Sequence, residues 1–146
     1  MEIRLFSNQN AKKYMEKILK NHNDLEPEFY NHVKRWLEEP RDVKCYSLND
    51  SDHKENVGNI ILLSKCDYDP QKHHTNPFLL DYIYTFVKYR RNNLAYKMLS
   101  YIKTKTKEQV TAFCSNEESE HLFKKAEYVF SGYDPIMNIV PMYRFP

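Results

Sequence analysis

The sequence has little glycine, few cysteines and no long apolar stretch, and each absence excludes a class of protein. Two glycines and three cysteines stand among 146 residues. Three cysteines without a Cys-x-x-Cys pair form neither a disulfide framework nor a cysteine zinc site, so we expect reduced thiols and a cytoplasmic protein. No apolar run approaches the ~20 residues that span a bilayer. The first seven residues lead into a polar helix pattern, so no secretory signal or membrane segment is expected.

What the sequence contains is typical of a globular domain. It is 41% hydrophobic, 14% aromatic and 29% charged, whereas a disordered chain is poor in aromatic and aliphatic residues. The 22 lysines and arginines exceed the 20 aspartates and glutamates by two, so the net charge is +2 and the chain is no polycation. Its length favours one domain over residues 1–146, since a domain has about 150 residues.

Hydrophobic periodicity predicts the order β, α, α, β, β, β, α, β, α, β, β. The expected strands are 1–7, 43–48, 56–64, 78–87, 109–114, 128–130 and 139–145. The expected helices run from Ser7 or Asn8 to about Lys20, from about Pro27 to Pro40, over 92–105 and over 116–126. Hairpins combined with a β-α-β unit predict an α/β or α+β fold. Its sheet is mixed and mostly antiparallel, with helices on both faces.

The longest expected strand, 78–87, leads directly into a strongly basic helix. Seven lysines and arginines and no acid lie between Lys88 and Lys107. Such a helix suits an anionic ligand at its N-terminus, where free amides and the helix dipole attract negative charge. Lysines at 103, 105 and 107 spread around a helix and favour a solvated surface, so nucleic-acid binding is not expected.

Two segments resemble motifs of the GCN5-related N-acetyltransferases, the GNAT family. Residues 90–95, Arg-Arg-Asn-Asn-Leu-Ala, are similar to the R/Q-x-x-G-x-G/A loop, with Asn93 where the family has glycine. Residues 116–128 resemble N-x-x-A-x-x-L-Y-x-K-x-G-F, with Asn116, Leu122 and Lys125 matching and Glu127 in place of glycine. The element order also matches, so the resemblance covers essentially the whole chain and implies the GNAT fold.

The resemblance implies transfer of an acetyl group from acetyl-CoA directly to a primary amine in a ternary complex. In that loop, consecutive backbone amides face the cofactor pyrophosphate. Asparagine tolerates a positive φ, but we expect the Asn93 side chain to crowd the phosphate. The residues that the resemblance assigns to the cofactor are Thr85, Phe86, Val87, Arg90, Arg91, Asn92, Asn93, Leu94, Ala95, Tyr96, Asn116, Ser119 and Phe123.

The resemblance also raises the question of the catalytic acid. Phe123 stands where many members have a tyrosine that protonates the departing thiolate. Tyr128, Tyr133 or water could take over this role. Alternatively, the chain is a catalytically impaired module that binds acyl-CoA or a protein partner without turnover.

For the base, Asp81 is the candidate, because it lies nine residues before Arg90, where members acting on small amines often carry an acid. Strict alternation places Asp81, Ile83 and Thr85 on one face of the strand. A base there needs a raised pKa or a water relay. The alternative is a strand-edge aspartate paired with a lysine.

The acceptor and the assembly are less defined. Segments 21–39 and 67–76 would shape the acceptor groove in this family, and their acids Glu26, Glu28, Asp67 and Asp69 suit a cationic amine such as a polyamine, an aminoglycoside or a lysine side chain. Relatives are commonly dimers, so a homodimer is possible. His73 and His74 with Cys66 form no spaced ligand motif, so no metal is expected.

Overall fold

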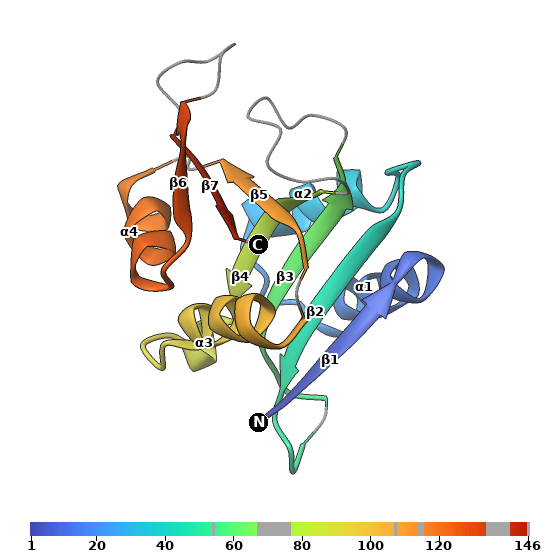
Figure 1. Cartoon of the computed structure of the whole chain (residues 1–146). Coiled ribbons are helices and arrows are strands. Elements are labelled where there is room, and N and C mark those ends of the chain that lie inside the picture. Colours follow the sequence, from blue (N-terminus) through green and yellow to red (C-terminus); the bar gives the residue numbers. More distant parts are fainter. Residues whose placement is uncertain (54, 67–76, 107, 114–115, 134–140, 146) are drawn as a thin grey trace.

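The computed structural model describes residues 1–53, 55–66, 77–106, 108–113, 116–133 and 141–145, the backbone alone for 129–133 and 141–145. It contains a seven-stranded sheet in the order β1-β2-β3-β4-β5-β7-β6 (Figure 1). The strands are β1 (Glu2–Ser7), β2 (Val43–Asn49), β3 (Val57–Lys65), β4 (Phe78–Thr85), β5 (Val110–Phe113), β6 (Val129–Tyr133) and β7 (Pro141–Phe145). The helices are α1 (Asn8–Asn21), α2 (Pro27–Trp36), α3 (Leu94–Tyr101) and α4 (Glu117–Lys125).

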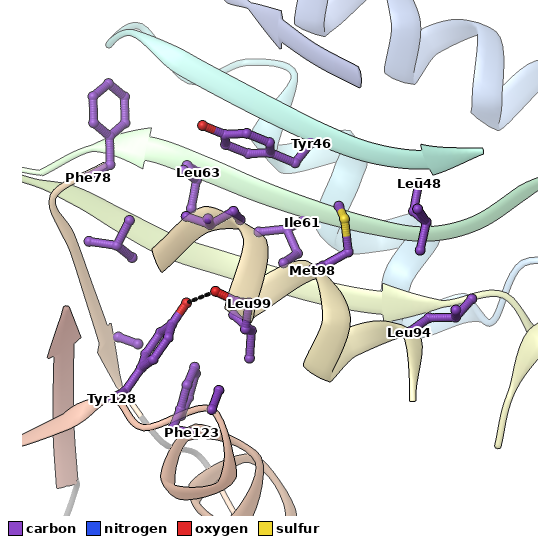
Figure 2. Close-up of a cluster of buried hydrophobic side chains, with 14 residues drawn as sticks. Tyr46, Leu48, Ile61, Leu63, Phe78, Leu94, Met98, Leu99, Phe123 and Tyr128 are labelled. Carbon is purple, nitrogen blue, oxygen red and sulfur yellow. Dashed lines mark hydrogen bonds between the residues drawn. The ribbon is translucent and has the colours of Figure 1, made fainter. Parts of the chain in front are cut away.

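Helices cover both faces of this sheet. Figure 1 shows α3 in front of the central strands and α1 and α2 behind them. Ala11, Met15, Phe29 and Trp36 of α1 and α2 pack on one face, in a core that includes Ile60. The opposite core joins α3 and α4 to the sheet through Tyr46, Ile61, Leu63, Met98, Leu99 and Phe123 (Figure 2). The predicted α+β class, with a mixed sheet between helices, is therefore confirmed.

The helices follow the apolar spacing of the sequence. In α1, Ala11, Met15 and Ile18 recur at steps of four and three and are buried. In α2, Pro27 occupies the first turn, where its missing N–H is no loss, and Phe29 and Trp36 face the sheet. No helix in the described part of the chain is long and apolar enough to cross a membrane.

The sheet divides between β4 and β5, its parallel pair of neighbours. These strands pair only at Phe78 with Val110 and at Leu79 with Thr111. Beyond these pairs, β4 continues with β3 as far as Thr85, and β5 continues with β7 as far as Phe113. We call the end of the β4–β5 pairing the fork. The backbone edge of β4 beyond Leu79 has no strand beside it on the β5 side among the described residues.

Two predicted boundaries differ from the structure. The strand expected over 78–87 ends at Thr85, and Val87–Tyr89 form a 3₁₀ turn. The helix expected over 92–105 begins at Leu94 and becomes a π turn over Ile102–Thr106. Within that turn, the hydroxyls of Thr104 and Thr106 donate to carbonyls four residues back at 2.7 Å, which disturbs regular helical pairing.

Candidate functional site

The loop between β4 and α3 turns the chain so that free amides lie at the start of α3. Arg91 has φ 70° and Asn93 has φ 56°, a left-handed conformation of the kind expected for Asn93. The first hydrogen bond of the helix runs from the Lys97 amide to the Asn93 carbonyl, at 3.0 Å. The amides of the first three helical residues, 94–96, thus have no acceptor within the helix, which makes this end attractive to an anion.

Both positions where the chain replaces a glycine of the resembled motifs keep the backbone that glycine would provide. Asn93 has φ 56° and Glu127 has φ 62°, and both side chains are exposed. The Asn93 Oδ1 accepts a long contact of 3.5 Å from Lys125 Nζ, which lies 4.9 Å from the Tyr96 ring centroid. The Asn93 side chain is thus engaged with α4.

Arg90 connects this loop to the segment before α2. Its Nε donates to the Thr85 carbonyl at 3.0 Å, and its guanidinium pairs with the carboxylate of Glu26, the residue that precedes α2. The Glu26 amide donates in turn to the Tyr84 hydroxyl at 3.2 Å. The Arg90 side chain therefore links the end of β4 to the α1–α2 segment. Asn92 donates to the Tyr89 carbonyl at 2.9 Å, which closes the turn.

Gly58 of β3 sets the position of the loop and of α3. A Cβ at Gly58 would lie 2.7 Å from Leu94 Cδ1, so the missing side chain lets the first residue of α3 pack against the sheet. The Gly58 carbonyl also accepts a hydrogen bond from the Phe86 amide at 2.9 Å. One glycine thus supports both ends of the loop, a role that the sequence pattern alone did not indicate.

Asn116 and Ser119 cap α4. The Asn116 Oδ1 accepts from the Ser119 amide at 2.8 Å, and the Ser119 hydroxyl donates to the Asn116 carbonyl at 3.0 Å. This is an N-cap that satisfies a free amide of the first turn. Both residues were predicted to contact the cofactor, and here they define where α4 begins beyond the end of β5.

Phe123 and Tyr128 lie in the core between α3 and α4. Phe123 is 2% exposed, and its ring centroid is 5.4 Å from that of Tyr128. The Tyr128 hydroxyl donates to the Leu99 carbonyl at 3.2 Å (Figure 2), and burial raises its pKa. Because this hydroxyl is hydrogen-bonded to the backbone of α3, the geometry gives no support to Tyr128 as the acid that protonates the departing thiolate. The side chain of Tyr133 lies outside the described residues.

A β-bulge changes which residues of β4 share a face. Tyr82 pairs with Leu62 and Leu80 with Leu63, so Asp81 has no partner on β3. Such an extra residue interrupts the alternation of side chains. Leu80 packs on the α3/α4 core and Tyr82 on the α1/α2 core.

Asp81 lies on the α1/α2 face, beside Trp36 and Ser64. Ile83 packs on the α3/α4 core instead. The expectation that Asp81 and Ile83 share a face is therefore wrong. Asp81 and Tyr82, which are consecutive in the chain, both face α2.

The Asp81 side chain is half-buried, and its carboxyl is incompletely hydrogen-bonded. Its Oδ2 has no hydrogen-bond partner, and no ion pair with a lysine is found for it among the described residues. Burial raises the pKa of Asp81 from 3.8 to about 6; the charge of Glu39 acts in the same direction, while Ser64 and Arg41 oppose it. A carboxylate in this environment is a proton acceptor near neutral pH.

Thr111 is a candidate site residue that the sequence pattern did not indicate. It is 3% exposed, and its Oγ1 has no hydrogen-bond partner. Val110 and Ala112 on either side pack in the α3/α4 core, so alternation places Thr111 on the same face as Asp81. The signal in the sequence was a single hydroxyl within an otherwise apolar short strand.

The described residues contain three buried side-chain atoms that lack a partner, and Asp81 Oδ2 and Thr111 Oγ1 are two of them. Both lie beside the fork. The third is Oδ1 of Asn59, whose Nδ2 donates to Thr85 Oγ1 at 2.8 Å. Buried polar atoms without partners are rare in folded proteins, and two of them beside the fork mark it as the candidate site.

Aromatic and acidic residues of α2 and β4 surround this face. The rings of Phe29 and Tyr84 are stacked with centroids 3.9 Å apart, and the ring centroids of His32 and Tyr82 are 4.9 Å apart. Burial raises the pKa of Tyr82, and the charges of Glu28 and Glu26 raise it further. Of the segments predicted to shape the acceptor site, 21–39 thus lies beside the fork, whereas 67–76, with Asp67 and Asp69, lies outside the described residues.

Metal-binding features were not expected, and the described ranges contain no group of three or more potential metal ligands. His73, His74 and Cys114 fall outside those ranges.

Comparisons with known proteins identify the fold. No family model and no curated protein matches the sequence. Solved structures match along nearly the whole chain. The Arabidopsis thaliana NAA60 structure with acetyl-CoA has a TM-score of 0.54 and 12% identity, with 99% of this chain and 98% of that chain covered. A protein of Desulfovibrio desulfuricans described as an acetyltransferase of the GNAT family has a TM-score of 0.60 and 8% identity, with 99% and 98% covered.

An aminoglycoside 6'-N-acetyltransferase of Acinetobacter haemolyticus has a TM-score of 0.56 and 17% identity, with 92% of this chain and 94% of that chain covered. These neighbours share the helix-flanked mixed sheet described above. The chain therefore has the GNAT acetyltransferase fold.

Proposed function

We propose that the protein is an acetyl-CoA-dependent N-acetyltransferase whose acceptor is a primary amine. The observation that carries this proposal is the arrangement along β4. At its carboxyl end lies a loop with the free amides of α3, and beside the fork lies the half-buried carboxyl of Asp81, whose Oδ2 has no hydrogen-bond partner. The fold of neighbours such as NAA60, crystallised with acetyl-CoA, supports the same cosubstrate.

The pyrophosphate would bind the amides of Leu94, Ala95 and Tyr96, where the helix dipole adds to the attraction. The pantetheine arm would then extend along β4 toward the fork. There, the backbone groups of β4 that have no strand beside them can bond its amides, as an added strand would. The proposed cofactor residues are 85–87 and 90–96 with Asn116, Ser119 and Phe123.

The acceptor would enter from the α1/α2 side and meet Asp81. The Asp81 carboxylate takes one proton from the ammonium group, and the neutral amine attacks the thioester carbonyl carbon. The carbon–sulfur bond breaks, and the second proton lost by the nitrogen neutralises the thiolate. The products are an amide and coenzyme A. Among the acids beside the fork, Glu28 has no ion-pair partner in the described residues, which favours a cationic acceptor.

One observation favours a second candidate, a module that binds acyl-CoA or a protein partner without turnover. Phe123 has no proton to give, and Tyr128 is bonded to Leu99. Asn93 and Glu127, by contrast, keep the left-handed backbone that glycine would provide in the motif, which supports cofactor binding. A measurement of free thiol separates the two candidates. An acetyltransferase releases coenzyme A from acetyl-CoA when an amine is present, whereas a module without turnover does not.

The test of the cofactor site is isothermal titration with acetyl-CoA and with coenzyme A. Ala95→Glu places a carboxylate in the first turn of α3. A carboxylate in the first turn stabilises the helix, but it repels a phosphate bound at the same amides. We expect micromolar binding to wild type and at least tenfold weaker binding to Ala95→Glu, with unchanged thermal unfolding. Lys105→Gln, on the exposed π turn, makes the same charge change and should leave binding intact.

Arg90→Ala tests the side chain that links this loop to Glu26, and we expect weaker binding because the loop loses its support. Wild-type protein that binds neither ligand at millimolar concentration would contradict the proposed function.

A further inference from the structure

We propose that the Thr111 hydroxyl is a second hydrogen-bonding group for the acceptor nitrogen, opposite Asp81 at the fork. This inference rests on the proposed function and adds to it a positioning residue on β5. It begins from the burial of Thr111, which is 3% exposed and whose Oγ1 has no partner. Burying a hydroxyl without a hydrogen bond is unfavourable, so a hydroxyl kept in this state requires an explanation.

The position of Thr111 supplies that explanation. Thr111 and Leu79 form the last pair before β4 and β5 separate. Asp81 follows Leu79 by two residues and lies on the α1/α2 face of the sheet, the face on which alternation also places Thr111. A group that enters the fork from the α1/α2 side therefore meets the carboxyl of one strand and the hydroxyl of the other.

The two groups match a primary ammonium ion. One N–H can donate to Asp81 and a second to the Thr111 oxygen, which accepts while its own proton turns away. After Asp81 has taken its proton, the remaining bond to Thr111 holds the nitrogen with its lone pair toward the thioester. Both groups stand on strands of one sheet, so little freedom is left to the bound amine.

This geometry predicts selectivity for primary amines. The N-methyl ammonium ion still has two N–H groups, but once Asp81 has taken a proton the neutral N-methyl amine keeps a single N–H. That one N–H must both bond Thr111 and supply the second proton lost, whereas a primary amine has a separate N–H for each. The N-methyl analogue therefore gives up the bond to Thr111 as the second proton leaves. Losing such a bond costs about tenfold in binding or rate. The discrimination between a primary amine and its N-methyl analogue should therefore depend on the hydroxyl of Thr111.

Thr111→Val tests the inference, because valine has nearly the same shape and no hydroxyl. The acceptor panel is spermidine, kanamycin and a lysine-containing peptide. The acceptor with the highest turnover is then compared with an analogue methylated at the reactive nitrogen. We expect kcat/KM for the primary amine to fall about tenfold in Thr111→Val. The analogue should be affected little, and the acetyl-CoA Kd should be unchanged. Thr111→Ser should restore most of the activity.

Thermal unfolding separates a ligand-binding role from a structural one. Removing an unpaired buried hydroxyl should leave Tm unchanged or raise it by about 2–4 °C. A lowered Tm would mean that the hydroxyl stabilises the fold, which would overturn the inference. Thr104→Val, which removes a surface hydroxyl that donates to the Ser100 carbonyl, is the matched control and should leave kcat/KM unchanged.

Unchanged kcat/KM and unchanged primary-amine selectivity in Thr111→Val, with wild-type turnover intact, would overturn the role of Thr111 alone. Wild-type protein that binds no acetyl-CoA, or that acetylates no member of the panel, would overturn the proposed function and this inference with it.

Discussion

At the scale of single residues, the unusual feature of the protein is a pair of buried polar atoms beside the fork, Asp81 Oδ2 and Thr111 Oγ1, that have no hydrogen-bond partner. Asp81 has this position because a bulge turns it toward α2, and Thr111 because it belongs to the last residue pair of β4 and β5. Both groups lower the stability of the folded chain. Proteins keep such groups where function uses them, at some cost in stability.

The raised pKa of Asp81 predicts a dependence of both activity and stability on pH. Its pKa in the folded state is about 6 against an ordinary value of 3.8, so between these values the folded state binds more protons than the unfolded state. Stability contributed by Asp81 is therefore lost as the pH rises from about 4 to above 6. The rate of acetyl transfer should rise over the same interval, with an apparent pKa near 6, because the base must be ionised.

Asp81→Asn removes this dependence. Above pH 7 the variant should be more stable than wild type by about 1–3 kcal/mol in urea unfolding, and the difference should vanish near pH 4. Its acetyl transfer should fall by at least a hundredfold. Asp52→Asn, at an exposed site between β2 and β3, controls for the loss of one negative charge. Equal pH profiles for wild type and Asp81→Asn would exclude Asp81 as the base.

At the scale of elements, the β4–loop–α3 unit carries the candidate cofactor site, and its position depends on β3. Leu94, the first residue of α3, is 3% exposed. Its side chain packs where a side chain at position 58 would otherwise lie. The Gly58 carbonyl also bonds the Phe86 amide at the start of the loop. The loop is therefore fixed by a residue almost thirty positions earlier in the chain.

Gly58→Ala should displace the start of α3. The new Cβ would lie 2.7 Å from Leu94 Cδ1, and a buried leucine can move only at the expense of its packing. We expect about 1–3 kcal/mol lower stability in urea unfolding and weaker acetyl-CoA binding by titration. Gly58→Ala combined with Leu94→Ala removes the clash, so the two losses should be less than additive, with Leu94→Ala alone as the reference. Strict additivity would refute this account of Gly58.

At the scale of the whole molecule, the sheet consists of two parts joined by the short β4–β5 pairing. One part is β1 to β4 and the other is β5, β7 and β6. Two residue pairs connect them within the sheet, and the α3/α4 core covers the junction on one face. A cosubstrate in the fork would contact both parts and strengthen this connection.

Acetyl-CoA should therefore stabilise the folded protein as a whole. At a concentration 100 times its Kd, a ligand specific for the folded state contributes about 2.7 kcal/mol. For a domain of this size the expected rise in Tm is about 5–10 °C, measured by scanning calorimetry. Ala95→Glu at the same ligand concentration should show a much smaller rise. The same large rise in both proteins would place the ligand elsewhere.

Much of this architecture could be predicted from the sequence. The element order and the α+β class follow from apolar periodicity, which depends on residues close together in the chain. The left-handed backbone at Asn93 follows from the resemblance of residues 90–95 to a loop with glycine at this position, together with the tolerance of asparagine for positive φ. The buried position of Trp36 and Phe29 follows from their spacing in one helix.

Tertiary structure alone decided the details of the site. The bulge that turns Asp81 toward α2 depends on how β4 pairs with Leu62 and Leu63, and local alternation carries no information on such long-range register. The missing partner of the Thr111 hydroxyl is likewise a property of its surroundings, set by where β4 and β5 stop pairing. Local sequence determined the elements, because their formation depends on near neighbours. The chemistry at the fork depends on contacts between distant segments, and only the folded chain specifies those.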